Sequence, residues 1–240
     1  MKLKNTPLTA LTCATLLGSA ALSQAALTIG DLISVNLTGT NAETVTPTGA
    51  AVIGAGSDTW TQVVGANWND SITSLSPIAL NKTTGASSGA TLTFSAGRAG
   101  GGPNTTNLDV FEGSFFLNGP DGDSSSTITL SGLGAGTKFD LYLYAAAGHT
   151  TNEGATFNFG STQTATDTNT NETSYALGVN YVKYSNLVAD GSGNISGTWA
   201  ISSGANYSTL NGMQIAIVPE PSAALLGGLG MLCLLRRRRA

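Results

Sequence analysis

The chain has 240 residues and a formal net charge of −4, and only 10% of its residues are charged. Its length suits one domain or two small ones. The dense basic run is confined to four arginines beside the C-terminus, so the rest of the chain offers no basic face for nucleic acid.

Residues 1–25 have the three-part layout of a secretory signal peptide. Lys2 and Lys4 form a basic region, residues 8–22 are apolar and uncharged, and small residues follow where signal peptidase cuts. We therefore expect export, with cleavage after Ala25 or Ala26. The alternative, a buried N-terminal helix, explains neither the basic flank nor the small residues.

Residues 26–217 are expected to form the extracytoplasmic domain. From Ala26 to Val218, four basic residues stand against thirteen acidic ones, a net charge of −9. Both cysteines, Cys13 and Cys233, fall outside this body, so it has neither a disulfide nor a cysteine-ligated metal. Its abundant Thr, Ser, Asn and Gly are typical of a secreted surface domain.

Short runs of alternating polar and apolar residues follow one another through this body, and such alternation predicts half-buried strands. In one run, Phe139, Leu141 and Leu143 share a face. The predicted strands cover 91–94, 126–130, 139–144, 155–159, 181–184, 199–201 and 213–217. The segment 27–69 is β-prone and polar, and its strands cannot be placed from the sequence.

Turn-forming residues separate these runs at 118–122, 132–136 and 190–194, and 97–103 is predicted to be a glycine-rich loop. Helical periodicity is nearly absent. Strands joined by such turns predict an all-β fold, an antiparallel β-sandwich or jelly roll. The N-terminal signal peptide and a single C-terminal transmembrane helix are expected to flank it.

Asp121 and Asp123 are candidate calcium ligands, because they stand in an oxygen-rich turn and calcium prefers hard oxygen ligands. The segment lacks a closing glutamate, and turns rich in Asp and Asn are common without metal. Calcium therefore stays an open alternative, and no other cofactor is expected.

Trp60 and Trp68 are candidate ligand-binding residues, since exposed aromatic rings can stack on sugars. Tyr142 and Tyr207 are further candidates of the same kind. The alternative for all four is packing in the core or at a sheet edge.

No catalytic residue is expected. The single histidine, His149, stands in a loop-like segment, and glycine-flanked serines such as Ser161 are not in a nucleophile-elbow motif. The acids Asp109, Glu112 and Glu153 are candidates for a pair of glycosidase carboxylates, but so acidic a body brings acids together by chance.

Residues 218–240 hold a short apolar segment followed by positive charge. An uncharged run that ends in arginines is a stop-transfer pattern, which keeps the arginines in the cytoplasm. The run 223–235 is shorter than the ~20 residues of a full span, but arginine stems can snorkel and the bilayer can thin. It suits a transient inner-membrane anchor, and a soluble helix with a basic cap is the alternative. The arginines are Arg236, Arg237, Arg238 and Arg239.

Pro219, Glu220 and Pro221 stand directly before this apolar run. The Pro-Glu-Pro motif, the apolar helix and the arginine cluster together resemble a PEP-CTERM sorting signal. The resemblance covers 218–240. It implies recognition by an exosortase, processing near the motif, and delivery to the cell surface or extracellular matrix of a bacterium that makes exopolysaccharide.

The body segments 127–144, 180–184 and 210–217, with the pair Trp68-Asn69, resemble those of a galactose-binding-like jelly roll. The resemblance implies that 210–217 forms the last core strand, and it leaves the ligand open. We therefore expect an exported surface or matrix protein with a structural or adhesive role in the envelope or biofilm. A carbohydrate-binding module for exopolysaccharide is the first alternative, and a secreted polysaccharide hydrolase is the second.

Overall fold

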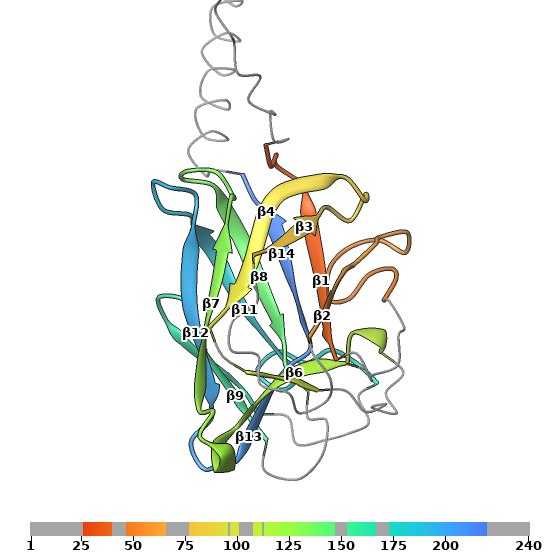
Figure 1. Cartoon of the computed structure of the whole chain (residues 1–240). Helices are drawn as coiled ribbons and strands as arrows, with labels where there is room; N and C mark the ends of the chain where they lie inside the picture. Colours follow the sequence, from red (N-terminus) through yellow and green to blue (C-terminus); the bar gives the residue numbers. More distant parts are fainter. Residues whose placement is uncertain are drawn as a thin grey trace, which may run out of the picture.

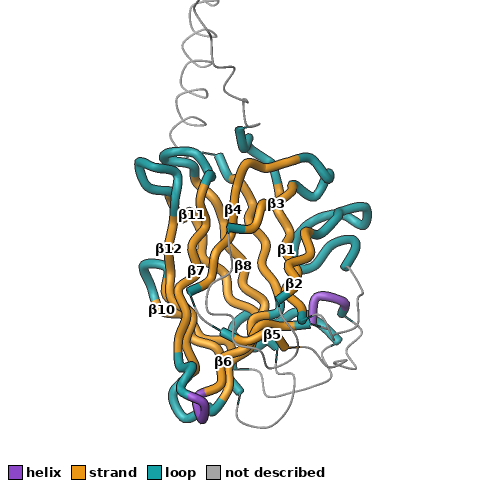
Figure 2. The backbone as a smooth tube through the Cα atoms, in the orientation of Figure 1, coloured by secondary structure: helices purple, strands orange, loops and turns teal. Residues whose placement is uncertain are grey.

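A computed structural model describes residues 26–39, 47–65, 77–95, 97–100, 108–111, 113–146, 153–166 and 173–219. Within these ranges the chain forms strands and two short 3-10 helices, η1 (Asp109–Phe111) and η2 (Gly119–Asp121). Two large sheets face each other, and a small third sheet lies at one end of them (Figure 1, Figure 2). The predicted all-β sandwich is confirmed.

The first sheet has five strands in the order β11-β8-β14-β1-β2. They are β11 (Tyr181–Val188), β8 (Lys138–Tyr144), β14 (Gly212–Ile217), β1 (Leu32–Thr38) and β2 (Thr61–Val64). All neighbours are antiparallel except β1 and β2, which run parallel. The first and last strands of the domain, β1 and β14, therefore lie side by side inside one sheet.

The second sheet has six antiparallel strands in the order β10-β9-β12-β7-β4-β3. They are β10 (Thr162–Ala165), β9 (Ala155–Asn158), β12 (Ile195–Ile201), β7 (Ser125–Ser131), β4 (Ser87–Phe94) and β3 (Ile78–Asn81). The third sheet, in the order β13-β6-β5, consists of β13 (Tyr207–Leu210), β6 (Ser114–Asn118) and β5 (Arg98–Gly100).

The core fills the space between the two large sheets. Phe139, Leu141 and Leu143 of β8 all point into it, as their alternation predicts, and each is fully buried. They belong to one cluster with residues of the opposite sheet such as Leu130 and Trp199. Period-two alternation thus places one apolar face of each sheet against the other.

Side-chain contacts join the two sheets along the edge where β10 and β11 meet. The Tyr184 hydroxyl donates to the Phe157 carbonyl at 2.7 Å, and the Gln163 amide donates to the Lys183 carbonyl at 2.7 Å. Burial raises the pKa of Tyr184 to about 12. A bulge at Asn186, whose φ is 56°, also interrupts the ladder of β11.

Two sequence expectations need correction. The predicted loop 97–103 contains the strand β5, which pairs with β6 and brings Arg98 opposite Phe116. Backbone pairing needs no particular side chains, so glycine-rich composition does not exclude a strand. Within 27–69, where no strand could be placed, the structure has β1 and β2, and the β1–β2 pair is parallel where only antiparallel pairing was expected.

Candidate functional site

Both ends of the described domain leave the sandwich at the same end (Figure 1). The N–H of Gly30 donates to the Ile217 carbonyl at 3.1 Å, and the N–H of Ile217 donates to the Asp31 carbonyl at 2.9 Å. The ladder continues with Leu32 opposite Ala216. The segment expected to follow signal-peptide cleavage and the segment that leads to the sorting motif therefore start from neighbouring strands.

The chain beyond β14 stays bound to the sheet almost up to the predicted motif. The N–H of Val218 donates to the Lys138 carbonyl at 3.0 Å, so only this residue separates the end of β14 from Pro219. Proline cannot donate to a ladder, and it ends the strand here. Any processing at Pro219-Glu220-Pro221 would take place directly beside the folded sandwich.

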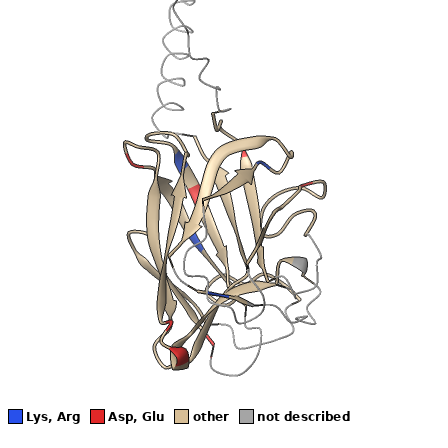
Figure 3. Ribbon diagram, in the orientation of Figure 1, with Lys and Arg blue, Asp and Glu red and all other residues tan. Residues whose placement is uncertain are grey.

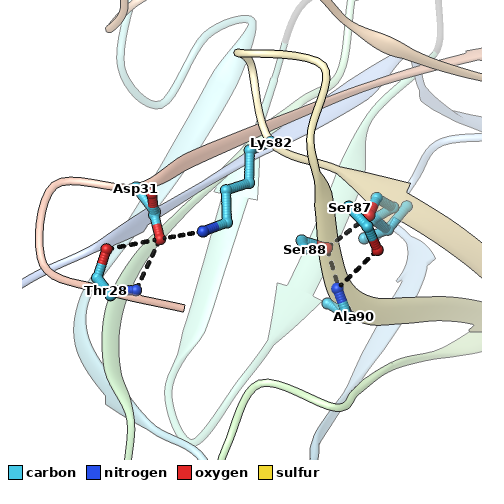
Figure 4. Close-up of polar contacts among 8 residues, drawn as sticks. Thr28, Asp31, Lys82, Ser87, Ser88 and Ala90 are labelled. Atoms are coloured by element: carbon cyan, nitrogen blue, oxygen red, sulfur yellow. Dashed lines mark hydrogen bonds and ion pairs between the residues drawn. The ribbon is translucent and has the colours of Figure 1, made fainter. Parts of the chain in front are cut away.

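A polar clamp holds the N-terminal turn at this end. The Asp31 carboxylate accepts hydrogen bonds from the Thr28 N–H at 2.6 Å and from the Thr28 hydroxyl at 2.9 Å (Figure 4). Lys82, in the turn after β3, forms an ion pair with it at 2.8 Å. Burial alone raises the pKa of Asp31, but the hydrogen bonds from Lys82 and Thr28 outweigh burial, and its pKa lies below the ordinary value of 3.8.

Asp31→Asn is expected to make the protein less stable at neutral pH. A lowered folded-state pKa means that the carboxylate stabilises the fold above the ordinary value of 3.8, and that this contribution disappears as the pH falls through the lowered pKa. The difference in unfolding free energy between wild type and variant should therefore shrink on acidification. Urea denaturation at a series of pH values measures it, and a difference that stays constant with pH would contradict the clamp.

Several residues expected to act in export lie outside the described residues. These are Ala25, Glu220, Pro221 and Arg236 to Arg239, whereas Ala26 and Pro219 are described and both are exposed. The expected anchor, 223–235, also lies outside. Among the residues that the structure does describe, no helix is long and apolar enough to cross a membrane.

Of the two interpretations of Trp60, an exposed ring for sugar stacking or packing, the structure agrees with packing. Trp60 exposes only 7% of its surface, and its indole N–H donates to the Gly49 carbonyl at 3.0 Å. Its ring lies 6.4 Å from that of Tyr144, in a second cluster on the outer face of the five-stranded sheet. Tyr142 is buried in the same cluster, Tyr207 is half-buried, and Trp68 lies outside the described residues.

A buried polar network lies beneath this cluster. The Tyr144 hydroxyl donates to the Gln214 side-chain carbonyl, and the Gln214 amide donates to the Ser34 hydroxyl at 2.9 Å and to the Ile53 carbonyl at 3.1 Å. The N–H of Val52 donates to the Tyr144 hydroxyl at 3.2 Å. Burial raises the pKa of Tyr144 far above its ordinary value, so the phenol stays neutral. The network ties the segment around residues 52–53 to the sheet.

A small hollow of about 190 Å³ opens beside Trp60. Pockets for drug-sized ligands usually measure about 300–1,000 Å³. This hollow is smaller than that range, so we interpret it as a gap in the packing around Trp60 and not as a site for a large ligand. Its lining residues are Pro47, Thr48, Ala50, Trp60, Leu108, Val110 and Tyr175.

The candidate calcium ligands Asp121 and Asp123 face a cation supplied by the protein itself. The Arg98 guanidinium lies 3.2 Å from the Asp121 carboxylate and 2.7 Å from that of Asp123. The Asn118 amide also donates to Asp121 at 2.9 Å. In the ranges that the structure covers, no group of three or more His, Cys, Asp or Glu side chains could hold a metal. The contacts around these two acids are therefore those of an ion pair between the η2 turn and β5.

Of the three candidate acids, Glu153 is the one whose side chain the structure describes. Glu153 exposes 5% of its surface, and its backbone bridges to Tyr207. Asp109 begins the short helix η1, while Glu112 and His149 lie outside the described residues.

The chain matches no protein-family model and no curated protein. One solved structure with a similar part is the enzymatically active domain of tailspike protein 4 of bacteriophage CBA120. The match has a TM-score of 0.31 and 17% sequence identity, and it covers 54% of this chain but only 18% of that chain. A similarity of this size carries no argument about fold or activity.

Proposed function

We propose that this protein is exported, is held for a time in the inner membrane by its C-terminal segment, and is delivered by an exosortase-type system to the cell surface or extracellular matrix. Signal peptidase removes residues 1–25, and the exosortase acts near Pro219-Glu220-Pro221. The body then serves a structural or adhesive role, with the galactose-binding-like jelly roll as its more detailed fold.

The position of the two ends of the described domain is the observation that carries this proposal. Because β1 and β14 pair from Leu32 opposite Ala216 to Asn36 opposite Gly212, residues 26–31 and 218–219 leave from one end of the sandwich. A domain tethered through its C-terminus then stands with that end toward the membrane. The outer face of the six-stranded sheet is then free to meet other molecules.

The short distance between strand and motif supports the same arrangement. Val218 is still hydrogen-bonded to the sheet, so a tether beginning near Pro219 holds the sandwich close to the bilayer. Its net charge of −9 adds repulsion from an anionic membrane surface, and this favours release once the tether is cut.

Changing Pro219, Glu220 and Pro221 together to alanine is expected to leave the protein in the inner membrane. The motif is what the sorting enzyme would recognise, whereas the apolar run and the arginines that retain it are unchanged. Membrane fractionation of the native host followed by immunoblotting measures the distribution of the protein.

A matched control replaces Ser192, an exposed residue of the turn after β11, by alanine and should be sorted like the wild type. Release of the triple variant into the medium in the processed form would falsify the sorting proposal.

The alternative function, binding of carbohydrate, has one observation in its favour, the large uncharged face of the six-stranded sheet. It is compatible with the sorting proposal, because a matrix protein must hold to some matrix component.

A further inference from the structure

The six-stranded sheet contains no charged residue in any of its strands. Its sequences are IALN, SSGATLTF, SSTITLS, ATFN, TQTA and ISGTWAI. In Figure 3 the ribbons of β4, β7 and β12 accordingly carry neither acidic nor basic colour. The five-stranded sheet, by contrast, carries Lys138, Asp140 and Lys183.

The side chains on the outer face of this sheet are mostly threonine and serine. Successive side chains along a strand point to opposite faces of the sheet. Because Leu92, Ile128 and Trp199 are buried in the core, the residues next to them in each strand point outward. The outward side chains are Ala79, Asn81, Ser87, Thr91, Thr93, Ser125, Thr127, Thr129, Ser131, Thr156, Asn158, Thr162, Thr164, Ser196, Thr198 and Ala200. None of them is aromatic.

Strand register arranges these residues in rows that cross the sheet. One row joins Thr93 of β4, Thr129 of β7 and Ser196 of β12, and the Thr129 and Ser196 hydroxyls lie 2.8 Å apart. The next row runs from Thr127 through Thr198 and Asn158 to Thr162. Neighbouring strands are about 4.8 Å apart, so each row presents a closely spaced line of hydrogen-bonding groups.

A shallow hollow of about 280 Å³ lies on this face. It is lined by Thr127, Asn158, Gly160, Ser196, Gly197 and Thr198. Gly160 has no side chain to fill it, while exposed hydroxyls of the second row border it. A hydroxyl can donate one hydrogen bond and accept two, so the hollow offers both kinds of partner to a bound group.

The chemistry of the face decides which partner fits. Acidic polymers and nucleic acid are disfavoured because the face has no cation and the body carries a net charge of −9. Protein interfaces centre on buried aromatic, aliphatic or arginine anchors, and this face has no aromatic ring or arginine. A neutral polymer rich in hydroxyl groups matches its donors and acceptors without the cost of desolvating a charge.

We propose that the outer face of the six-stranded sheet binds a neutral polysaccharide whose chain lies along the rows of hydroxyl groups. This inference deepens the proposed function. It rests on the proposed export of the protein, because the protein meets the polysaccharide only outside the cell. The hollow at Thr127 and Thr198 is the centre of the site, and the rows on either side extend it.

The test is affinity electrophoresis of the full chain, purified in mild detergent, through gels that contain hydroxyethylcellulose, dextran or galactomannan, with alginate as the acidic comparison. At least one neutral polymer should retard the wild type, and alginate should not. Changing Thr127 and Thr198 together to valine removes two hydroxyls but keeps side-chain shape and strand propensity, and it should raise the dissociation constant about tenfold.

The control removes two exposed hydroxyls away from the face, with Thr84→Val and Ser192→Ala, and should bind like the wild type. Thermal unfolding of both variants verifies that they are folded. Retardation by none of the three neutral polymers, retardation by alginate alone, or equal binding by the face variant would overturn the inference. Since the assay uses purified protein, its result is independent of the sorting experiment, and either proposal can fail alone.

Discussion

Trp199→Ala is expected to lower the free energy of unfolding by about 3–5 kcal/mol, the range found when large aromatic residues are removed from a core. Trp199 is fully buried between the two large sheets, where it lies opposite Phe157 of β9 and Ser126 of β7. Its indole N–H donates to the Ser208 hydroxyl at 2.7 Å, which links the six-stranded sheet to β13. The change therefore opens a cavity and leaves a buried hydroxyl without its donor.

Chemical denaturation followed by circular dichroism measures this loss. Val188→Ala removes an apolar side chain that is 51% exposed and should change stability by no more than about 0.5 kcal/mol. Trp199→Phe is the companion variant, because domains are often only about 5–15 kcal/mol stable and the alanine variant can fail to fold. If Trp199→Ala cost no more than Val188→Ala, the indole would not be the core residue described above.

Gln214→Leu is expected to lower the unfolding free energy by at least about 2 kcal/mol, since a buried polar group without a partner costs about 1–3 kcal/mol. Gln214 is fully buried and accepts from Tyr144 while donating to Ser34 and to the Ile53 carbonyl. Leucine keeps much of the volume but supplies none of these bonds. The segment that covers the outer face of the five-stranded sheet should loosen first, which increases exposure of Trp60.

A second substitution separates the network from simple packing. In Gln214→Leu the Tyr144 hydroxyl loses the acceptor of its hydrogen bond. The double variant Gln214→Leu/Tyr144→Phe removes this hydroxyl as well, and replacement of both partners by apolar groups can be nearly neutral. The double variant should recover part of the stability lost by Gln214→Leu, as measured by a double-mutant cycle in urea. Gln163→Leu, at a half-buried edge, serves as the control and should cost about 1 kcal/mol. Additive effects of the two core substitutions would contradict the network.

Local alternation was sufficient to predict seven of the fourteen strands in the described residues. The predicted strand 139–144 corresponds to β8, and 126–130 and 213–217 correspond to β7 and β14. In each of these strands one face is buried and the other is more polar. Apolar and more polar residues therefore alternate along the sequence, where the pattern can be recognised from neighbouring residues.

The missed strands differ in how much local contrast they carry. In β1 the apolar Ile33, Val35 and Leu37 do alternate with polar residues, and this signal was overlooked. Its polar residues Ser34 and Asn36 are as buried as their neighbours, because other parts of the chain cover the outer face of the five-stranded sheet. In β5, pairing with β6 and the ion pairs of Arg98 with two distant aspartates replace a hydrophobic pattern. The sequence likewise left open whether Trp60 is exposed or packed, since the aromatic rings that bury it come from distant parts of the sequence.

The sequence by itself determined the all-β class, the main turns and the abundance of hydroxyl side chains, because each follows from the identity of neighbouring residues. Only the tertiary structure decided which strands pair. Pairing brings Ser34 into contact with Gln214, 180 residues away, and so places both ends of the described domain together. The same pairing sets the register that turns scattered threonines into rows, since alignment across strands depends on long-range contacts that no local pattern encodes.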